Sequence, residues 1–566
     1  MPFARIGQKS WKSGQIVPRI PKRCFSKAAI CRQSGQTSSP LDAETHDVVI
    51  VGAGAAGLAL ASALTRPSSS ARSCRIALVE ASDLSKVREW SLPSDQYSNR
   101  VSSVTNRSLS FLKTCDLHSH LNQTRTNSIQ EMEVWDGVSD ARISFRASEL
   151  LGREHSTNMS TMMENLNLQR SLLKTLQSNS SIILLDKTKV DSIAKPNDDA
   201  NSWPLITLDN GRVLRARLLV GADGFNSPVR RFAGIDCYGW SYDTQAVVAT
   251  LFHPSRSTGN TTAFQRFLPT GPIAFLPLSP TISSLVWSTK PHIASSLRSV
   301  HPDVLSLMIN AAFRLPQISL QYLYDYISEK GRDGLQVERN ELADEIRWRE
   351  AAHSIQPYSA LSSTSDKQGD ISEGFDLLPP LVEHIQAGSV ASFPLRFNHA
   401  ETYLGEGLGS RTVLVGDAAH SLHPLAGQGL NLALGDVEEL ASCIDDAISH
   451  GIDFGSRTAL LPYVRNRYFE NHKVMSAVDK LHKLYSSQLP PVVWARSVGL
   501  EVVNELDSLK TALMLSAGAD SRTTPNPWNA AADGVTLVNN GIEFLKTGAS
   551  VISGTVGSAV RNVLKV

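Results

Sequence analysis

Residues 416–431 read GDAAHSLHPLAGQGLN, and they are the most informative segment of the chain. They follow the apolar run 412–415, which predicts a buried strand, and they lead into 430–440, which predicts a helix. A helix that begins here presents free backbone N–H groups and the positive end of its dipole. Pro424 stiffens the loop, and the glycines let backbone approach a ligand closely. The segment therefore predicts a site for an anionic or electron-rich ring, with a simple strand–loop–helix connection as the alternative.

A second motif, GAGAAG at residues 52–57, lies between the apolar run 46–51 and the helical pattern 58–64. The next predicted strand, 75–79, ends at Glu80, about 20 residues past the glycines, where an acid binds a ribose hydroxyl. This context predicts a dinucleotide site, and the glutamate favours FAD or NAD over NADP. The alternative is a close-packed turn in a doubly wound fold that binds nothing. The glycines of the motif are Gly52, Gly54 and Gly57.

A third motif, GADG at residues 221–224, follows the predicted strand 213–220 and precedes a short helix. A carboxylate held between glycines at a strand end, here Asp223, serves either a cofactor or the loop around it. Arg230 on the short helix either supports a phosphate or pairs with an acid. The alternative for the whole motif is an Asp-Gly turn followed by a helix cap.

Two further polar residues are candidates for the same site. Arg100, in the segment 98–104, either contacts the pyrophosphate or is a surface arginine. Gln169 lies on the predicted helix 164–173, where it either donates to a cofactor hydroxyl or faces solvent.

Composition narrows the function classes. The 566 residues carry a formal charge of +1, so nothing indicates a nucleic-acid partner. No apolar run approaches the roughly 18 residues that a membrane span needs. The six cysteines form no CxxC pair, so neither a metal site nor a disulfide framework is indicated, and a reducing compartment is expected.

The first 41 residues differ in composition from the rest. They contain eight Lys or Arg and no Asp or Glu. This is typical of a mitochondrial transit peptide, and the sequence RCFS at 23–26 resembles a cleavage site before Ser26. A disordered basic tail is the alternative.

Between the GADG motif at 221–224 and the segment 416–431, apolar and polar residues alternate, which predicts an antiparallel sheet. Its expected strands are 244–252, 262–268, 273–278 and 283–288. Four aromatic side chains in them either cover a flat substrate or belong to the core. They are Phe264, Phe267, Phe275 and Trp287.

The remaining patterns are mainly helical. Residues 304–313 and 322–352 predict helices, and 359–374 predicts a disordered loop. We interpret 320–385 as an expanded loop with no catalytic part. Apolar residues at helical spacing in 556–564 indicate either a weak membrane or partner face or a frayed terminus.

The three motifs, in this chain order, resemble the FAD-dependent aromatic-ring hydroxylases, which are flavoprotein monooxygenases. The amino-acid sequences of 416–431 and of the predicted hairpin 264–278 with 285–288 are most similar to the ubiquinone-biosynthesis branch. The resemblance covers about residues 47–517. It implies an α/β chain with a para-hydroxybenzoate hydroxylase-like FAD-binding fold, a β-sheet substrate domain and C-terminal helices.

On this interpretation the chain has five regions. They are a transit peptide at 1–41, the first part of the FAD-binding domain at 42–241, the substrate domain at 242–400, the second part of the FAD-binding domain at 401–475 and a helical region at 476–566.

The resemblance also implies a role for each motif. The first would bind the ADP half of FAD, Asp223 and Asp417 would lie near its central part, and the loop after Pro424 would lie along the flavin ring. The expected cofactor-binding residues are Gly52, Gly54, Gly57, Glu80, Arg100, Gln169, Asp223, Asp417, Pro424, Gly427, Gln428, Gly429 and Asn431. No side chain is expected to be an obligatory acid or base, and His420 and His423 are expected to hold the loop.

The activity implied by the resemblance is hydroxylation at C5 of a polyprenylated 4-hydroxybenzoate-type phenol, with O2 activated as a C4a-hydroperoxyflavin. It further implies a ferredoxin-type electron donor, a complex with other ubiquinone-biosynthesis proteins, and a place in the mitochondrial matrix with peripheral contact to the inner membrane. Three alternatives stay open: an NADPH-dependent small-phenol hydroxylase of secondary metabolism, an isoprenoid-chain reductase, and a flavin-binding scaffold subunit without catalysis.

Overall fold

The computed structural model describes residues 43–150, 158–177, 179–196, 202–355, 377–506, 510–511, 513–514 and 517–518. The predictions for the leader 1–41, for the loop 359–374 and for the apolar pattern 556–564 lie outside the described residues.

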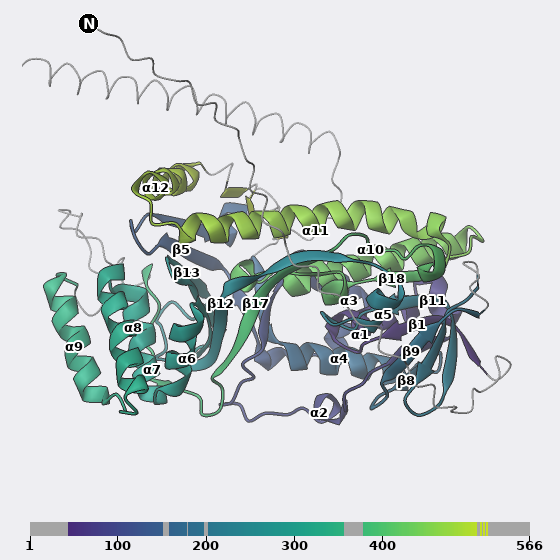
Figure 1. Ribbon diagram of the computed structural model, residues 1–566, viewed down its shortest axis with the longest axis horizontal. Helices are drawn as coiled ribbons and strands as arrows, with labels where there is room; N and C mark the ends of the chain where they lie inside the picture. The colour runs from purple at the N-terminus through teal and green to yellow at the C-terminus, as the bar shows by residue number, and fades with distance from the viewer. Residues whose placement is uncertain are drawn as a thin grey trace, which may run out of the picture. The chain divides into compact units, whose positions relative to one another are not determined.

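A seven-stranded sheet carries the first motif (Figure 1). Its order is β8-β2-β1-β11-β10-β9, and β18 pairs with β11. The strands β8, β2, β1, β11 and β18 pair in parallel, whereas β10 pairs antiparallel with both β11 and β9. The bounds are β1 Glu44–Val51, β2 Ile76–Val79, β8 Ile182–Leu185, β9 Val190–Ala194, β10 Leu205–Leu208, β11 Val213–Gly221 and β18 Thr412–Leu414.

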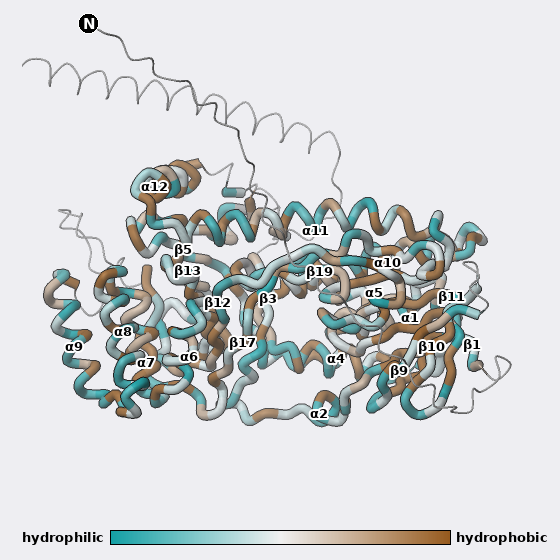
Figure 2. Tube along the Cα trace, in the orientation of Figure 1, coloured by the Kyte–Doolittle hydropathy of each residue, from teal (hydrophilic) through white to brown (hydrophobic). Residues whose placement is uncertain are grey.

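Helices cover this sheet because its central strands are apolar on both faces. Residues 48–50 of β1 are fully buried, as expected of a parallel strand between two helical layers. The hydrophobic colour of β1 and α1 in Figure 2 marks this core. The helix α1 (Ala55–Thr65) packs against α4 (Asn165–Gln177) and α10 (Gly429–Ser449). Short helices lie at the margin, namely α2 (Ser85–Arg88), α3 (Asn106–Thr114) and α5 (Pro228–Phe232).

A nine-stranded sheet lies in the region expected to be the substrate domain, and it confirms the predicted strands. Its order is β19-β17-β12-β15-β14-β13-β5-β6, with β16 beside β12, and every pair is antiparallel except β13 with β5. The bounds are β5 Glu131–Asp136, β6 Arg142–Arg146, β12 Cys237–Phe252, β13 Thr262–Leu268, β14 Gly271–Ser279, β15 Ile282–Thr289, β16 His384–Ile385, β17 Ala391–Ala400 and β19 His420–Ser421.

The aromatic residues of this sheet belong to the core. Phe264, Phe275 and Trp287 are fully buried in one cluster, and Phe267 stacks on Tyr485 with ring centroids 4.0 Å apart. The structure therefore favours the core role of these side chains over the covering of a substrate. A third, three-stranded sheet, β3-β7-β4, lies beside α4, with bounds β3 Val101–Thr105, β4 Thr126–Ile129 and β7 Ser160–Glu164.

Four helices cover the nine-stranded sheet on one side. They are α6 (Pro291–Ser299), α7 (Pro302–Arg314), α8 (Gln317–Arg332) and α9 (Arg339–Ala352). The helices predicted over 304–313 and 322–352 are confirmed as α7 and as α8 with α9, so the first half of the region 320–385 is helix rather than loop. Leu320, Leu323 and Ile327 of α8 are buried in the domain core, which gives this insertion the apolar contacts that hold it as helix.

The helix α11 (Arg457–Ser486) crosses the domain boundary that we expected at 475. Its buried residues continue on one face past that point, at Met475, Val478 and Tyr485, so the helix remains packed along its length. The helix α12 (Pro490–Glu505) follows after a short turn. In the described part of the chain, no helix has both the length and the apolar content that crossing a bilayer requires.

Candidate active site

The three motifs meet at one edge of the parallel sheet. Because β2, β1, β11 and β18 run parallel, their carboxyl ends lie together, and each motif begins where one of these strands ends. Backbone hydrogen bonds join them: Gly52 N–H donates to Val79 O at 2.8 Å, and Ala222 N–H donates to Val51 O at 2.8 Å. Val415 N–H donates to Gly221 O at 3.0 Å. The sequence prediction of one composite site is thus matched by the strand order.

The glycines of the first motif have two distinct reasons to be glycine. Gly52 has φ +102°, and a Cβ there would lie 2.3 Å from Ala222 O. A Cβ at Gly57 would lie 1.9 Å from Gly52 O, so the helix and the strand can only pack this closely without a side chain. By contrast, a Cβ at Gly54 would meet nothing within 4 Å. The protein itself leaves the space at Gly54 open, which is the space that a pyrophosphate needs at a helix start.

Glu80 is fixed against the glycine loop. Its Oε2 accepts from Ala53 N–H at 2.7 Å, and its Oε1 accepts from Ser82 N–H at 2.8 Å. The Ser82 hydroxyl also donates to Oε1. A carboxylate has about four acceptor positions, so about one, on Oε2, remains for a hydroxyl group. The position at the end of β2 is the one expected of the ribose-binding acid.

Asp223 presents a carboxylate oxygen that the protein does not satisfy. Its Oδ2 accepts from Val229 N–H at 3.1 Å, whereas Oδ1 is buried without a hydrogen-bond partner among the described residues. Burial raises the pKa of this carboxyl, against the opposing effect of Ser227 and of the backbone at Val229. A buried acceptor without a donor is costly, so this atom indicates a missing donor such as a cofactor hydroxyl.

Arg230 binds two backbone carbonyls of the site. Its Nη1 donates to Ala418 O at 2.7 Å, and its Nη2 donates to Phe225 O at 2.6 Å. Because Ala418 belongs to the third motif, the guanidinium fastens the second motif to the third.

Replacing Arg230 should weaken the binding of FAD. We expect Arg230→Met to weaken FAD binding by roughly tenfold or more, since a hydrogen bond to a charged group contributes about 1.5–3 kcal/mol. Quenching of flavin fluorescence in an FAD titration measures the effect. The matched control is Arg231→Met, a change of the exposed neighbouring arginine. Equal affinities for the two variants would contradict the assignment.

The third motif ends in an uncapped helix start. The helix α10 begins at Gly429, with Gln428 as its N-cap residue and no side-chain cap hydrogen bond. Gly427 is exposed with φ +60°. Asp417 is also exposed, yet the surrounding protein raises its pKa by desolvation. The open backbone N–H groups favour negative charge at this place.

Asn431 holds the loop rather than offering free polar atoms. Its Oδ1 accepts from Thr105 N–H at 3.0 Å, and its Nδ2 donates to Ser103 O at 2.8 Å and to Gly427 O at 3.3 Å. These bonds tie β3 to the start of α10, so the structure gives Asn431 a positioning role.

Arg100 and Gln169 lie on this same flank. Arg100 immediately precedes β3 and is exposed, and its carbonyl accepts from Asn165 N–H at 3.1 Å. Asn165 is the first residue of α4, which carries the half-buried Gln169 one turn further along. The structure therefore brings both candidates to the border of the site without showing a contact to its loops.

A buried network behind the third motif was not predicted. Asp436 of α10 is fully buried and accepts from Gly416 N–H at 3.1 Å, from His420 Nε2 at 2.6 Å and from Arg467 Nε at 3.0 Å. It also accepts from Asn471 Nδ2 at 2.8 Å. Burial alone would raise the pKa of Asp436, but His420 and then Arg467 outweigh it and lower the pKa to about 2. The network fixes the backbone at Gly416, and its contact with His420 agrees with the loop-holding role expected for that residue.

The lowered pKa values of two other histidines predict that the fold loses stability in acid. Burial lowers the pKa of His423 to about 3 and that of His399 to about 4, below the ordinary 6.5. The unfolded chain therefore binds protons that the folded chain does not, so stability is complete above pH 6.5 and is lost as the pH falls towards 4. Each histidine contributes about 1.4 kcal/mol per pH unit in that window.

Urea unfolding at a series of pH values measures this loss. His423→Asn keeps an acceptor for Leu425 N–H, which His423 Nδ1 now receives at 3.1 Å, but it does not titrate. The variant should lose stability less steeply below pH 6.5. An unchanged slope would contradict the origin that we assign to it.

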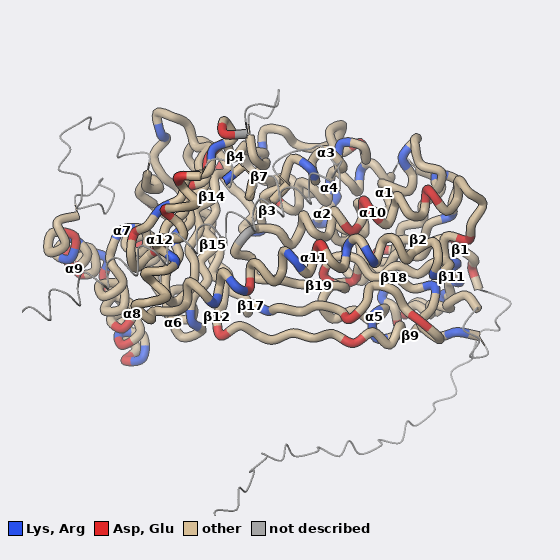
Figure 3. Tube along the Cα trace, turned by 90° about the horizontal axis from the view of Figure 1, so that it is seen from above, with Lys and Arg blue, Asp and Glu red and all other residues tan. Residues whose placement is uncertain are grey.

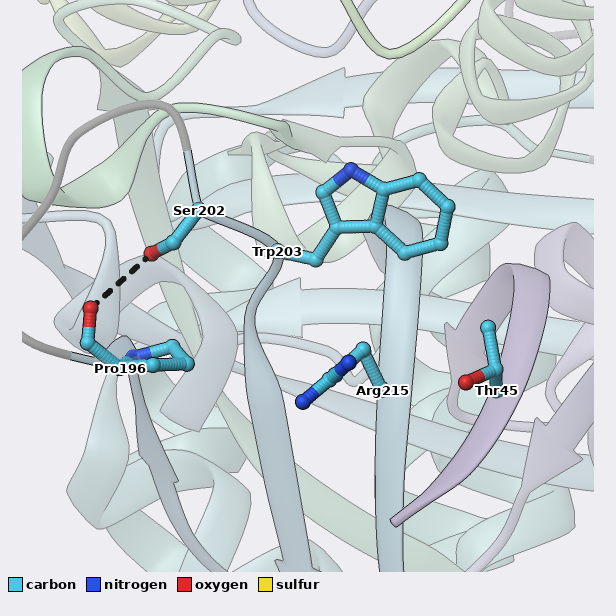
Figure 4. Close-up of a pocket in the computed structure, with 5 residues that line it drawn as sticks. All are labelled: Thr45, Pro196, Ser202, Trp203 and Arg215. Carbon is cyan, nitrogen blue, oxygen red and sulfur yellow. Dashed lines mark hydrogen bonds between the residues drawn. The ribbon is translucent and has the colours of Figure 1, made fainter. Parts of the chain in front are cut away.

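A separate hollow of about 380 Å³ lies at the other end of the parallel strands (Figure 4). It is lined by Thr45 near the start of β1, by Arg215 near the start of β11, and by Pro196, Ser202 and Trp203. Since the motifs gather at the carboxyl ends of these strands, this hollow does not belong to the site.

Three features together fit FAD: the open space at Gly54, the unsatisfied Oδ1 of Asp223 and the uncapped start of α10. Sequence comparison agrees. The model of the FAD binding domain family matches residues 45–322 and 384–468. A crystal structure of p-nitrophenol 4-monooxygenase PnpA from Pseudomonas putida shares the fold, with a TM-score of 0.57 at 15% identity over 85% of this chain and 100% of that one. The fold and site thus define an FAD-dependent monooxygenase.

Curated relatives narrow the class. The chain is 36% identical over 516 residues to the mitochondrial ubiquinone biosynthesis monooxygenase COQ6 of Saccharomyces cerevisiae, covering 88% of this chain and 100% of that protein. It is 38% identical over 484 residues to the COQ6 protein of Schizosaccharomyces pombe, covering 83% of this chain and 91% of that protein. The chain belongs to the COQ6 family of ubiquinone biosynthesis monooxygenases.

Proposed function

We propose that this protein hydroxylates C5 of the aromatic ring of a polyprenylated 4-hydroxybenzoate-type precursor of ubiquinone. The observation that carries the proposal is the meeting of three strand-end loops that fit a single FAD, in a chain of the COQ6 family. We place the reaction in the mitochondrial matrix, with the protein peripheral on the inner membrane, because the curated relatives are named mitochondrial.

The residues divide between the two halves of the cofactor. In this proposal Gly52, Gly54, Gly57 and Glu80 hold the ADP half, while Asp223 and Asp417 bind hydroxyls of its central part. Pro424, Gly427, Gln428 and Gly429 lie along the flavin ring, and Arg100 and Gln169 contact the cofactor from the β3 flank.

When bound and reduced, FAD would supply the electrons that activate O2, and one oxygen atom of that O2 would reach the ring. The protein supplies placement and electrostatics. The free N–H groups at the start of α10 would stabilise negative charge on the edge of the flavin ring beside them. Asp436 and Arg230 keep that helix start and the strand ends in register, through Gly416 N–H and Ala418 O.

We further propose that the electrons come from a ferredoxin-type donor, and that the protein works in a complex with other ubiquinone-biosynthesis proteins. The sequence supports the first point because its one complete dinucleotide fingerprint, at 52–57, is already assigned to FAD.

The intermediate that accumulates in cells lacking this protein tests the reaction. We expect a polyprenylated precursor that lacks the C5 hydroxyl, and restoration of ubiquinone by the wild-type gene. Normal ubiquinone content in the deleted cells, or accumulation of a precursor that already carries this hydroxyl, would contradict the proposal. NADPH-dependent turnover of small phenols by the purified protein would favour the secondary-metabolism alternative.

A further inference from the structure

The helix α12 has an unusual distribution of side chains. Among its residues only Arg496 is buried, whereas Trp494 is 60% exposed, and Leu489 just before the helix is 65% exposed. An apolar helix that points its single cation inward and its tryptophan outward is the reverse of the usual pattern of a surface helix.

The buried arginine fixes this orientation. Arg496 Nε and Nη2 donate to the two carboxylate oxygens of Asp136 at 2.7 and 3.0 Å, and both side chains are fully buried. Its Nη1 donates to the carbonyls of residues 484, 485 and 487 at the end of α11. Turning α12 to hide its outer side would break a buried, bidentate ion pair, so the apolar exposure is a stable property of the fold.

The exposed apolar surface continues onto the end of α11. Leu481 and Leu484 are 40% and 38% exposed, and Lys480 and Lys483 are exposed beside them. We call Lys480, Leu481, Lys483, Leu484, Leu489 and Trp494 the α11–α12 face. Both helices lie along the top of Figure 1 and are seen from above in Figure 3.

The chemistry of the α11–α12 face indicates its occupant. Residues 480–500 contain no Asp or Glu. Asp479, just before this segment, is buried and pairs with Lys483 at 2.7 Å, and the exposed acids of α12, Glu501 and Glu505, lie near its carboxyl end. Leucine and tryptophan side chains rimmed by lysine are typical of helices that lie in the interface of an anionic bilayer.

A pocket of about 420 Å³ opens beside this face. Lys483 and Ser486 of α11 line it together with Trp240 and Tyr242 of β12. The Tyr242 ring packs edge-on against His423, with centroids 5.2 Å apart, and His423 immediately precedes Pro424. His423 is fully buried, and its Nε2 has no hydrogen-bond partner among the described residues.

The inner side of α12 reaches the same loop. Leu500 and Val503 pack on a cluster that contains Tyr485, and Leu425, the residue after Pro424, packs on the same cluster. The helix α11 contacts the short helix at 424–426, and α12 packs on the same apolar cluster as Leu425, so both helices that carry the face lie against the cofactor loop or its neighbours.

We propose that the α11–α12 face seats the protein on an anionic lipid surface, and that the pocket beside it admits the aromatic head of a lipid substrate from that surface. The identity of the substrate rests on the proposed function, whereas the lipid contact does not.

Vesicle flotation of the full-length holoenzyme tests the lipid contact. The wild type should float with phosphatidylcholine vesicles that contain cardiolipin and much less with phosphatidylcholine alone. Trp494→Glu should weaken binding at least tenfold. The matched control is Trp348→Glu on α9, where the tryptophan is 64% exposed, and it should bind like the wild type. FAD content and Tm verify that each variant is folded.

Two outcomes overturn the lipid contact. One is a wild type that binds neither kind of vesicle, which would leave a protein partner as the occupant. The other is a Trp494→Glu variant that floats as well as Trp348→Glu, which would move the contact to another part of the chain.

A substitution in the pocket tests the second half of the proposal without any electron donor. A short-chain prenylated 4-hydroxybenzoate should perturb the absorption spectrum of the oxidised flavin in the wild type. Ser486→Trp should abolish this perturbation while vesicle flotation and FAD content stay unchanged. The control, Ala477→Trp, changes an exposed residue of α11 outside the pocket lining. Equal perturbation in both variants would show that the substrate enters elsewhere.

These readouts are independent of the proposed reaction. The prediction about ring hydroxylation in cells can be wrong while the flotation and spectral predictions are confirmed. The opposite result is equally possible.

Discussion

The Gly54→Ala variant will purify as a folded protein that has lost its yellow colour. The backbone at Gly54 has φ −68° and ψ −177°, which an alanine adopts without strain, and its Cβ would meet no protein atom within 4 Å. Loss of glycine at the N-cap costs at most about 1 kcal/mol of stability. The new methyl group would instead fill the space at the start of α1 where the pyrophosphate binds. We expect FAD affinity to fall by about 100-fold, or roughly 2.7 kcal/mol.

The Gly57→Ala variant separates loss of folding from loss of FAD binding alone. There the Cβ would lie 1.9 Å from Gly52 O, so the strand and helix would have to separate and the protein should misfold. Far-ultraviolet circular dichroism and an FAD titration of both variants distinguish the two cases. If Gly54→Ala bound FAD as tightly as the wild type, the first motif would not hold the cofactor.

The Asp436→Ala variant should fold but be much less stable than the wild type. It would leave Arg467 and His420 buried without their shared carboxylate and would free Gly416 N–H. Removing one member of a buried ion pair costs about 3–5 kcal/mol. For a domain of this size we expect a fall in Tm of roughly 10 °C, accompanied by loss of FAD.

An exposed ion pair provides the control for this prediction. Arg457 and Glu406 are 63% and 65% exposed and form a salt bridge at 2.8 Å. Arg457→Ala should cost less than about 1 kcal/mol, because solvent screens exposed pairs. Similar Tm values for the two variants would show that the network around Asp436 does not stabilise the third motif.

Much of the site could be predicted because its signals are local. The glycines of 52–57, the acid at Glu80 and the loop 416–431 each lie within one strand–turn–helix unit, where spacing alone indicates the chemistry. The alternating strands of the substrate domain were predictable for the same reason.

The network around Asp436 could not be predicted, because its members come from places far apart in the chain. His420, Asp436, Arg467 and Asn471 are brought together only when α10 packs on α11. In the sequence Asp436 looks like an ordinary helical acid beside Glu438. The hydrogen bonds of Arg230 could not be predicted for a related reason, since its acceptors are backbone carbonyls, which carry no sequence signal.

The arrangement of α8 and α9 could not be predicted from the local sequence pattern. Residues 322–352 indicate helix, but the break between α8 and α9 and their burial against the substrate domain depend on tertiary contacts of Leu320 and Ile327.

The central claim is that the ends of β1, β11 and β18 close over one FAD. Titration of the apoprotein with FAD, followed by flavin fluorescence, tests it most directly. We predict saturation at one FAD per chain. An apoprotein that is folded by circular dichroism and leaves the fluorescence of added FAD unchanged would contradict the account.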